Sequence, residues 1–249
     1  MQLLPGTLEE MYKNGYSLNL KGEKQKLDDC IRRDEATSIA QVLHNTKATV
    51  SIETGVASGA SALAICHILK QNGNGEARHY GVDPNQMSYY GGAAMANLEK
   101  EGLSGIFHLL EGPSHQQIPE LISKGEKVDF ALIDGWHTFD YTLIDFFLVD
   151  KLLKPGGYIA FHDVYGRAKQ KVINFILTHR KYRIAKEAMH FDKEQYIRTF
   201  RFFLWRLYKD PGLLFSWYHW KYQSKNSSGL LILQKLEDFE PDYDFFKNF

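Results

Sequence analysis

Apolar and polar positions alternate along the chain in two periods, one typical of strands and one typical of helices. Residues 48–70 read ATVSIETGVASGASALAICHILK, which predicts a short strand, a glycine-containing turn and a helix. The same pattern predicts further strands at 78–82, 106–110, 128–133, 158–161, 182–188 and 229–236. Helical stretches separate the strands, so we expect an α/β protein. The helix expected at 138–153 has an apolar face made of Tyr141, Ile144, Leu148 and Leu152.

The segments outside this pattern are interpreted as additions to one main domain. Residues 1–47 are predicted to form N-terminal accessory helices, because 23–45 carries apolar residues among charges as a helix packed on one side would. Residues 48–249 form the main domain, with an aromatic-rich insertion at 191–228. The insertion carries one stripe of Tyr196, Phe200, Phe203, Leu204, Leu207 and Tyr208. Such a stripe is expected to cover an acceptor site or to form a homo-oligomer, ahead of binding a membrane surface.

Composition limits the setting in which the chain works. Its 249 residues suit one large domain, and 30 Lys and Arg balance 30 Asp and Glu, so no net field attracts nucleic acid or a membrane. Two cysteines provide no disulfide framework. The sequence contains no run of about eighteen apolar residues, so it predicts no membrane span. We therefore expect a cytoplasmic protein.

The turn after the first strand has the chemistry of a nucleotide site. Gly55 permits a sharp backbone turn, Gly59 permits close approach of a ligand, and Ser58 can cap the helix whose N-terminal amides face outward. The dinucleotide fingerprint G-x-G-x-x-G does not fit, because its second and third glycines are missing. The residues from Glu53 to Ser61 read E-x-G-x-x-x-G-x-S instead.

Polar residues follow three of the predicted strands. Asp83 comes directly after the second strand, where a carboxylate can accept hydrogen bonds from the hydroxyls of a ribose held at the first turn. Asp134 and His137 follow the fourth strand, and His162 and Asp163 follow the fifth. Because ligands of open α/β sheets lie outside the carboxyl ends of the strands, these last four side chains are expected to converge.

The motifs within 48–164 stand in an order that resembles class I S-adenosylmethionine (AdoMet) methyltransferases. They run E-x-G-x-x-x-G-x-S, a strand-ending aspartate, I-D-G-x-H, L-K-P-G-G and H-D-V. The set is most similar to the small-molecule O-methyltransferases, a group that includes the catechol and macrolide-sugar enzymes. The resemblance implies a Rossmann-like, doubly wound, mostly parallel seven-stranded sheet with helices on both faces. It also implies cofactor contacts by Glu53, Gly55, Ala57, Ser58, Gly59, Ser61, Asp83, Asp134 and, at the adenine, Ser114 and His115.

The resemblance further implies methyl transfer to a hydroxyl, with His137 as the catalytic base. Asp134 and Asp163 are expected to hold a divalent metal, Mg²⁺ or Mn²⁺, because the resembling enzymes bind theirs with residues at these strand ends. His162 departs from that pattern, since those enzymes have Asp or Glu there. A histidine ligand would favour Mn²⁺, Fe²⁺ or Zn²⁺. Alternatively, no metal binds and His137 or His162 acts alone as base, or both histidines only hydrogen-bond the backbone.

Two other functions are compatible with the sequence. One is an AdoMet-binding protein without turnover, and the other is a nucleic-acid methyltransferase that binds through the basic, aromatic insertion. The balanced charge and the lack of an Asn/Asp-Pro-Pro-Tyr/Phe tetrapeptide disfavour nucleic acid. The acceptor is therefore expected to be a hydroxylated small molecule, whether a sugar, a phenol or another metabolite.

Overall fold

The fold was analysed in a computed structural model of the chain. It describes residues 2–27, 30–73, 75–185 and 229–249, together with Leu204, Leu207, Tyr208 and Pro211. The insertion expected at 191–228 lies outside the described residues except for those four positions. No helix in the described part of the chain is long and apolar enough to cross a membrane.

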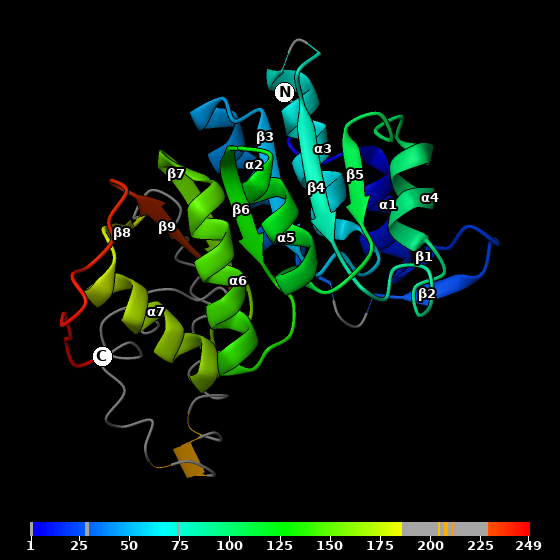
Figure 1. The fold of residues 1–249 in the computed structure, drawn as a ribbon. Coiled ribbons are helices and arrows are strands. Elements are labelled where there is room, and N and C mark those ends of the chain that lie inside the picture. The colour runs from blue at the N-terminus through cyan, green and yellow to red at the C-terminus, as the bar shows by residue number, and fades with distance from the viewer. Residues whose placement is uncertain are drawn as a thin grey trace.

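A seven-stranded sheet forms the centre of the fold, with the order β5-β4-β3-β6-β7-β9-β8 (Figure 1). The strands are β3 (Val50–Thr54), β4 (Arg78–Val82), β5 (Phe107–Leu110), β6 (Val128–Ile133), β7 (Leu153–Phe161), β8 (Tyr182–Ile184) and β9 (Leu231–Lys235). Neighbouring strands from β5 to β7 pair in parallel, and β9 lies antiparallel between β7 and β8. The expected doubly wound sheet is confirmed. Its strand order reverses between β3 and β6, the position at which such folds bind ligands.

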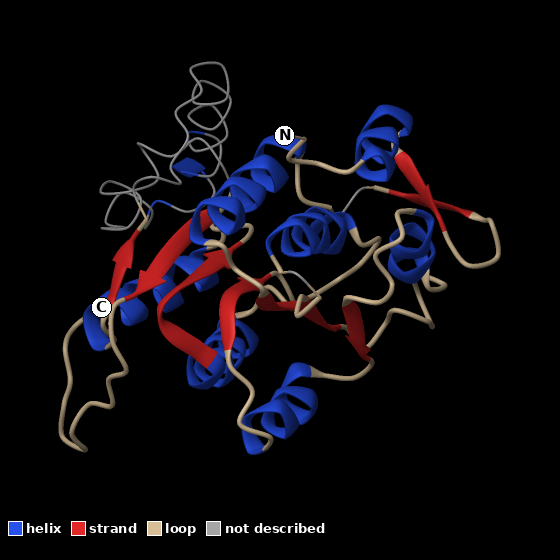
Figure 2. Cartoon of the chain, turned by 90° about the horizontal axis from the view of Figure 1, so that it is seen from above, coloured by secondary structure: helices blue, strands red, loops and turns tan. Residues whose placement is uncertain are grey.

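Helices cover both faces of the sheet, as the view from above shows (Figure 2). One face packs against α1 (Gly6–Asn14), α2 (Arg33–Thr46), α3 (Ala60–Asn72) and α4 (Ala93–Lys100), and the other against α5 (Ser114–Ser123), α6 (Phe139–Leu152) and α7 (Arg167–His179). Alternate residues of β6 divide between these layers: Phe130 and Leu132 face α3, whereas Ala131 and Ile133 face α6. Burial of the sheet on both faces explains the apolar run from Phe130 to Ile133 in β6.

The N-terminal segment differs from the all-helical prediction. Residues 24–26 do not begin a helix, because β1 (Tyr16–Leu18) and β2 (Lys24–Lys26) form an antiparallel hairpin between α1 and α2. Gly15 ends α1 in the left-handed region, with a φ of 73°, and the chain turns back on itself. The helix α2 starts only at Arg33, where the Glu35 carboxylate accepts a hydrogen bond from the Arg32 amide at 2.9 Å. Both N-terminal helices contribute to the same core as α3.

The expected buried face of α6 is confirmed only at its C-terminal end. Leu152 is buried and Leu148 is half-buried, but Tyr141 and Ile144 are exposed, and the buried face also carries Asp145, Phe146 and Val149. The helix is apolar around most of its circumference, so its sequence gives only a weak periodic signal. Tertiary packing against α5, β6 and α7 decides which side is covered, and it brings an aspartate inside.

Candidate active site

The turn between β3 and α3 has the backbone conformation that its glycines require. Gly55 has a φ of 82°, and a Cβ atom there would collide with the carbonyl oxygen of Asp134. Gly59 has a φ of 85°, and its Cβ would lie 2.7 Å from Cα of Ala94. No other residue fits either position without strain. The expectation that Ser58 caps α3 is wrong, because Gly59 occupies the N-cap position and no side chain caps the helix.

Asp83 fixes this turn from the end of β4. Its Oδ2 accepts hydrogen bonds from the amides of Val56 at 3.0 Å and Ala57 at 2.9 Å, and its Oδ1 accepts one from Asn85 at 2.8 Å. The side chain is 4% exposed and still lines the cavity described below. A carboxylate has about four lone-pair positions, so Asp83 retains capacity for a ligand hydroxyl while it shapes the turn.

Glu53 does not lie at the cavity wall, contrary to the expected contact with the cofactor. Its side chain is fully buried, and its Oε1 lies 3.1 Å from Nε2 of His79. Nδ1 of His79 in turn lies 2.8 Å from Oγ of Ser51. The three side chains form a polar row inside the sheet layer, because β3 and β4 are covered on both faces. Glu53, the acidic residue at the start of the motif, therefore contacts another buried side chain and not the cavity.

A cavity of about 1000 Å³ opens outside the carboxyl ends of β3, β4, β6 and β7. The residues from the sequence motifs that line it are Gly55, Ala57, Ser61, Asp83, Ser114, Asp134, His137, His162 and Asp163. The expected site residues that do not line it are Glu53, Ser58, Gly59 and His115. His115 is exposed, with its ring centroid 6.4 Å from that of Tyr141. The volume is large enough for a ligand of several rings.

Ser114 reaches the cavity at the start of α5 and donates a short hydrogen bond to Oδ1 of Asp145. Asp145 lies on α6, is 2% exposed and also lines the cavity. Burial raises the pKa of this carboxyl, against the opposing effect of the Ser114 hydrogen bond. The sequence analysis missed Asp145, because the apolar face that it assigned to α6 did not include this position.

Four polar residues meet at the ends of β6 and β7, as the strand-end argument predicts. Nδ1 of His162 lies 3.1 Å from Oδ1 of Asp134, and Nδ1 of His137 lies 3.4 Å from Oδ2 of Asp163. Nε2 of His137 is 3.8 Å from the same Asp134 oxygen. The partly enclosed position of His137, together with the charge of Lys169, lowers the pKa of its imidazole. His137 is thus neutral at neutral pH and can accept a proton.

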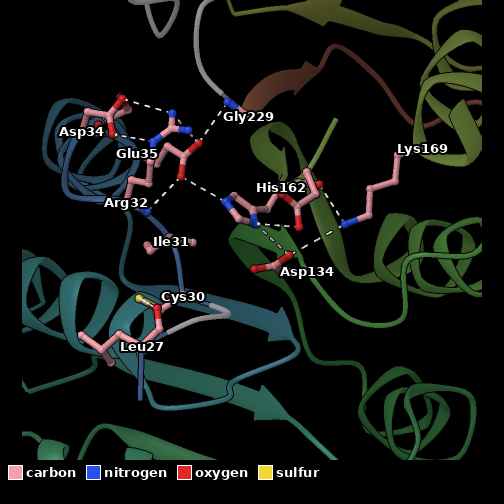
Figure 3. Close-up of polar contacts among 12 residues, drawn as sticks. Leu27, Cys30, Ile31, Arg32, Asp34, Glu35, Asp134, His162, Lys169 and Gly229 are labelled. Atoms are coloured by element: carbon pink, nitrogen blue, oxygen red, sulfur yellow. Dashed lines mark hydrogen bonds and ion pairs between the residues drawn. The ribbon is translucent and has the colours of Figure 1, made fainter. Parts of the chain in front are cut away.

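Two residues that the sequence analysis did not identify complete this cluster (Figure 3). Glu35, on α2 and 1% exposed, lies with its Oε2 3.0 Å from Nε2 of His162. Lys169, on α7 and 1% exposed, donates to the carbonyl oxygen of His162 at 2.8 Å, and its Nζ lies 3.7 Å from Oδ1 of Asp134. Burial alone would lower the pKa of His162, but the hydrogen bonds and charges of Asp134 and Glu35 raise it to about 10.

The resemblance implies a divalent metal held by Asp134 and Asp163 at the ends of β6 and β7. Within the described residues, Asp134, His162 and Asp163 place possible ligand atoms within 4.8 Å of one another. Both ring nitrogens of His162, however, face carboxylates, so both carry hydrogen and neither offers a lone pair. The ammonium of Lys169 also faces Asp134. As arranged, these residues do not fit a divalent cation, because His162 and Lys169 already place two positive charges there.

Comparisons with known proteins agree with this fold. Residues 52–164 match a family described as a methyltransferase domain. A flavonoid 3',5'-methyltransferase of Vitis vinifera is 28% identical over 131 residues, which cover 51% of this chain and 52% of the relative. The chain thus spans about half the length of the curated relative it matches.

Solved structures share the architecture at low identity. The O-methyltransferase TomG of Streptomyces achromogenes, involved in tomaymycin synthesis and solved in complex with SAM, superposes with a TM-score of 0.57 at 14% identity, covering 72% of this chain and 81% of that one. An O-methyltransferase of Bacillus cereus, solved in complex with SAH, superposes with a TM-score of 0.58 at 16% identity. The match covers 72% of this chain and 82% of that one. Residues 52–164 thus match a methyltransferase domain, and the seven-stranded sheet shares its fold with solved O-methyltransferases.

Proposed function

We propose that this chain transfers a methyl group from AdoMet to a hydroxyl of a small-molecule acceptor. The observation that carries the proposal is a single cavity at the switch point of the sheet, bordered by the glycine turn on one side and by His137 on the other. The matched family and the names of the relatives support the same reaction. A donor and an acceptor held side by side in such a cavity would react far faster than in solution.

The cofactor is placed against the turn in this proposal. The amides at the start of α3, with Gly55, Ala57 and Ser61, suit its amino-acid end. Asp83 suits the ribose hydroxyls, and Ser114 suits the adenine edge. When bound, AdoMet supplies an electrophilic methyl group on a sulfonium.

His137 is proposed to take the proton of the acceptor hydroxyl. With Nδ1 directed at Asp163, a neutral imidazole keeps its proton there and leaves the Nε2 lone pair to accept another. AdoMet would supply the methyl group to the acceptor oxygen and leave as S-adenosylhomocysteine, and His137 would take the hydroxyl proton. Asp134 and Asp163 then stabilise the imidazolium that forms.

The lining of the cavity suits an acceptor with a flat, apolar portion. It includes Tyr90, Trp136, Tyr165 and Ile31. Trp136 is 65% exposed. Aromatic side chains bind ring systems through their faces, which favours a phenol over a sugar. The relatives named for flavonoid methylation and tomaymycin synthesis point in the same direction.

The setting of the enzyme is also a proposal. We propose a cytoplasmic location, because the chain has only two cysteines. Assembly of copies through 191–228 rests on the aromatic stripe of that segment alone. Sedimentation of the full chain and of a variant lacking 191–228 would test it: a mass that does not change on deletion argues against assembly through this segment.

The proposed reaction is tested in two steps with the full chain. Calorimetry with AdoMet and S-adenosylhomocysteine should show binding, whereas binding of NAD without AdoMet would reject the assignment. Transfer from AdoMet labelled in its methyl group is then measured with panels of phenols, sugars and nucleic acids. Labelled phenols are the expected product, labelled nucleic acid would favour the alternative substrate, and binding without any transfer would favour a cofactor-binding protein.

A further inference from the structure

The polar cluster at the ends of β6 and β7 is completed from the N-terminal part of the chain. Glu35 of α2 contacts His162 at the carboxyl end of β7, and Figure 3 shows the imidazole between this carboxylate and Asp134. A carboxylate only accepts hydrogen bonds, so a histidine with one on each side must donate from both nitrogens. His162 is therefore an imidazolium with both N–H groups in use.

Glu35 is itself held firmly in place. Its Oε1 accepts a hydrogen bond from the amide of Gly229 at 3.0 Å and lies 3.0 Å from Nη2 of Arg32. Its Oε2 accepts from the amide of Arg32 at 2.9 Å as well as from His162. Burial opposes the ionised form, but the bond to His162 and the nearby cations keep the pKa of Glu35 below its usual value.

Two cations already lie between the carboxylates of the cluster. His162 lies against Glu35, Asp134 and Asp163, and Nζ of Lys169 lies 3.7 Å from Oδ1 of Asp134. A divalent ion placed among them would add two positive charges beside an imidazolium and a buried ammonium. Such a cluster gains no stability from the ion, because the added positive charge would be repelled by the imidazolium of His162 and the ammonium of Lys169.

We propose that His162, fixed between Glu35 and Asp134 and supported by Lys169, takes the place of a divalent cation, so that methyl transfer at this site needs no metal. The inference rests on the proposed function. In this arrangement Glu35 is a positioning residue: it acts through His162, which orients Asp134 toward the cavity and so toward His137. The helix α2, expected to be accessory, then belongs to the active site.

The test begins with metal binding, which does not depend on turnover. Mn²⁺ is titrated into the full chain with and without AdoMet, and the free ion is followed by electron paramagnetic resonance. We expect no stoichiometric binding at submillimolar Mn²⁺, and an initial rate that changes by less than about twofold after exhaustive treatment with chelator. One Mn²⁺ bound per chain, with turnover lost in chelator and restored by the ion, would overturn the proposal.

Variants then test the role of Glu35. Glu35→Gln should lower kcat by roughly tenfold, as expected for weakening one preorganised charge, with less than about twofold change in KM for AdoMet. Glu35→Asp should recover part of the loss. Glu99→Gln, the same change at an exposed position on α4, is the matched control and should keep full activity. An unchanged kcat in Glu35→Gln would contradict the positioning role.

A double variant gives the metal assay a positive arm. Glu35→Gln with His162→Asp replaces the imidazolium by a carboxylate and should bind Mn²⁺ at least about tenfold more tightly than the natural chain, since hard cations prefer carboxylate oxygens. Calorimetry with AdoMet verifies that each variant is folded. If no acceptor is methylated by any sample, the proposed function fails, and the Mn²⁺ titration of the natural chain still decides whether a metal site exists.

Discussion

His137 and His162 both approach Asp163, yet their surroundings shift their pKa values in opposite directions. His162 is enclosed by Glu35 and Asp134 and becomes a stable cation, with its pKa raised to about 10. His137 is more exposed, and its pKa is lowered. Pairs of groups whose pKa values are pushed apart mark the division of roles in an active site. Of the two, only His137 is suited to accept a proton at neutral pH.

Replacing His137 tests this division. His137→Gln should lower kcat by about 10²–10⁴-fold, the usual contribution of a general base, while AdoMet affinity stays within about twofold. The kcat of the natural enzyme should rise with pH through an apparent pKa below 6.5 and be level at neutral pH, because the base is active when deprotonated. Steady-state rates between pH 5 and 9 check both expectations. His108→Gln, an exposed histidine on β5, is the control.

Asp83 offers a second test at this scale, since it holds the turn and faces the cavity. Asp83→Ala leaves three backbone amides without their acceptor, so it should weaken AdoMet binding by about 1–3 kcal/mol and also lower the free energy of unfolding. Asp83→Asn keeps one acceptor oxygen, so it should lose less AdoMet affinity and less free energy of unfolding than Asp83→Ala. Calorimetry and urea unfolding measure the two effects. If Asp83→Ala unfolds like the natural chain, the amide contacts do not support the turn.

At the scale of elements, the turn between β3 and α3 joins the fold to the site. Its position depends on the close approach of Gly55 to the backbone of Asp134, at the end of the neighbouring strand β6. That contact keeps the glycine turn and the polar cluster side by side. Any side chain at Gly55 would push β3 and β6 apart at their carboxyl ends, where the cavity opens.

A pair of glycine variants separates this contact from backbone strain. Gly102→Ala introduces a residue at a φ of 69° with open space around it, and should cost about 1–2 kcal/mol. Gly55→Ala has a similar φ of 82° but also meets the Asp134 carbonyl, so it should cost more and abolish AdoMet binding. Urea unfolding and calorimetry compare them. Equal losses of stability would mean that the contact with Asp134 contributes nothing.

At the scale of the whole molecule, one buried ion pair ties the N-terminal helices to the centre of the sheet. Glu35 and His162 are 127 positions apart in the chain, and both are buried. The same core contains residues of α1, α2 and α3. Breaking the pair should therefore affect global unfolding, because an unpaired buried charge is costly.

The pH dependence of stability provides the measurement. The pKa of His162 is about 10 in the folded chain and near 6.5 when unfolded, so the folded state binds the extra proton between these values. The pair's contribution to the free energy of unfolding is full below pH 6.5 and declines as pH rises toward 10. The difference in unfolding free energy between the natural chain and Glu35→Gln should shrink over this window. A constant difference would show that His162 does not titrate with the pair.

Features that depend on local order could be predicted from the amino-acid sequence. Strand periodicity predicted the seven strands, and the glycine spacing predicted the turn at Gly55. The positions of Asp134 and His162 directly after strands predicted that they meet, since parallel strands end at one edge. These inferences hold because each depends on a repeat or a chain position, and neither depends on how the side chains pack.

Which charges are buried and paired could not be predicted from the sequence and follows from the packing of the folded chain. Glu35 follows Arg32 at the start of a helix and reads as surface in the sequence, and Lys169 lies in a helix with several other basic residues. Their burial against His162, like that of Asp145 against Ser114, comes from how α2, α6 and α7 pack on the sheet. The free energy of a charge depends on its solvent and its partners, and for these residues both are set by segments distant in the chain.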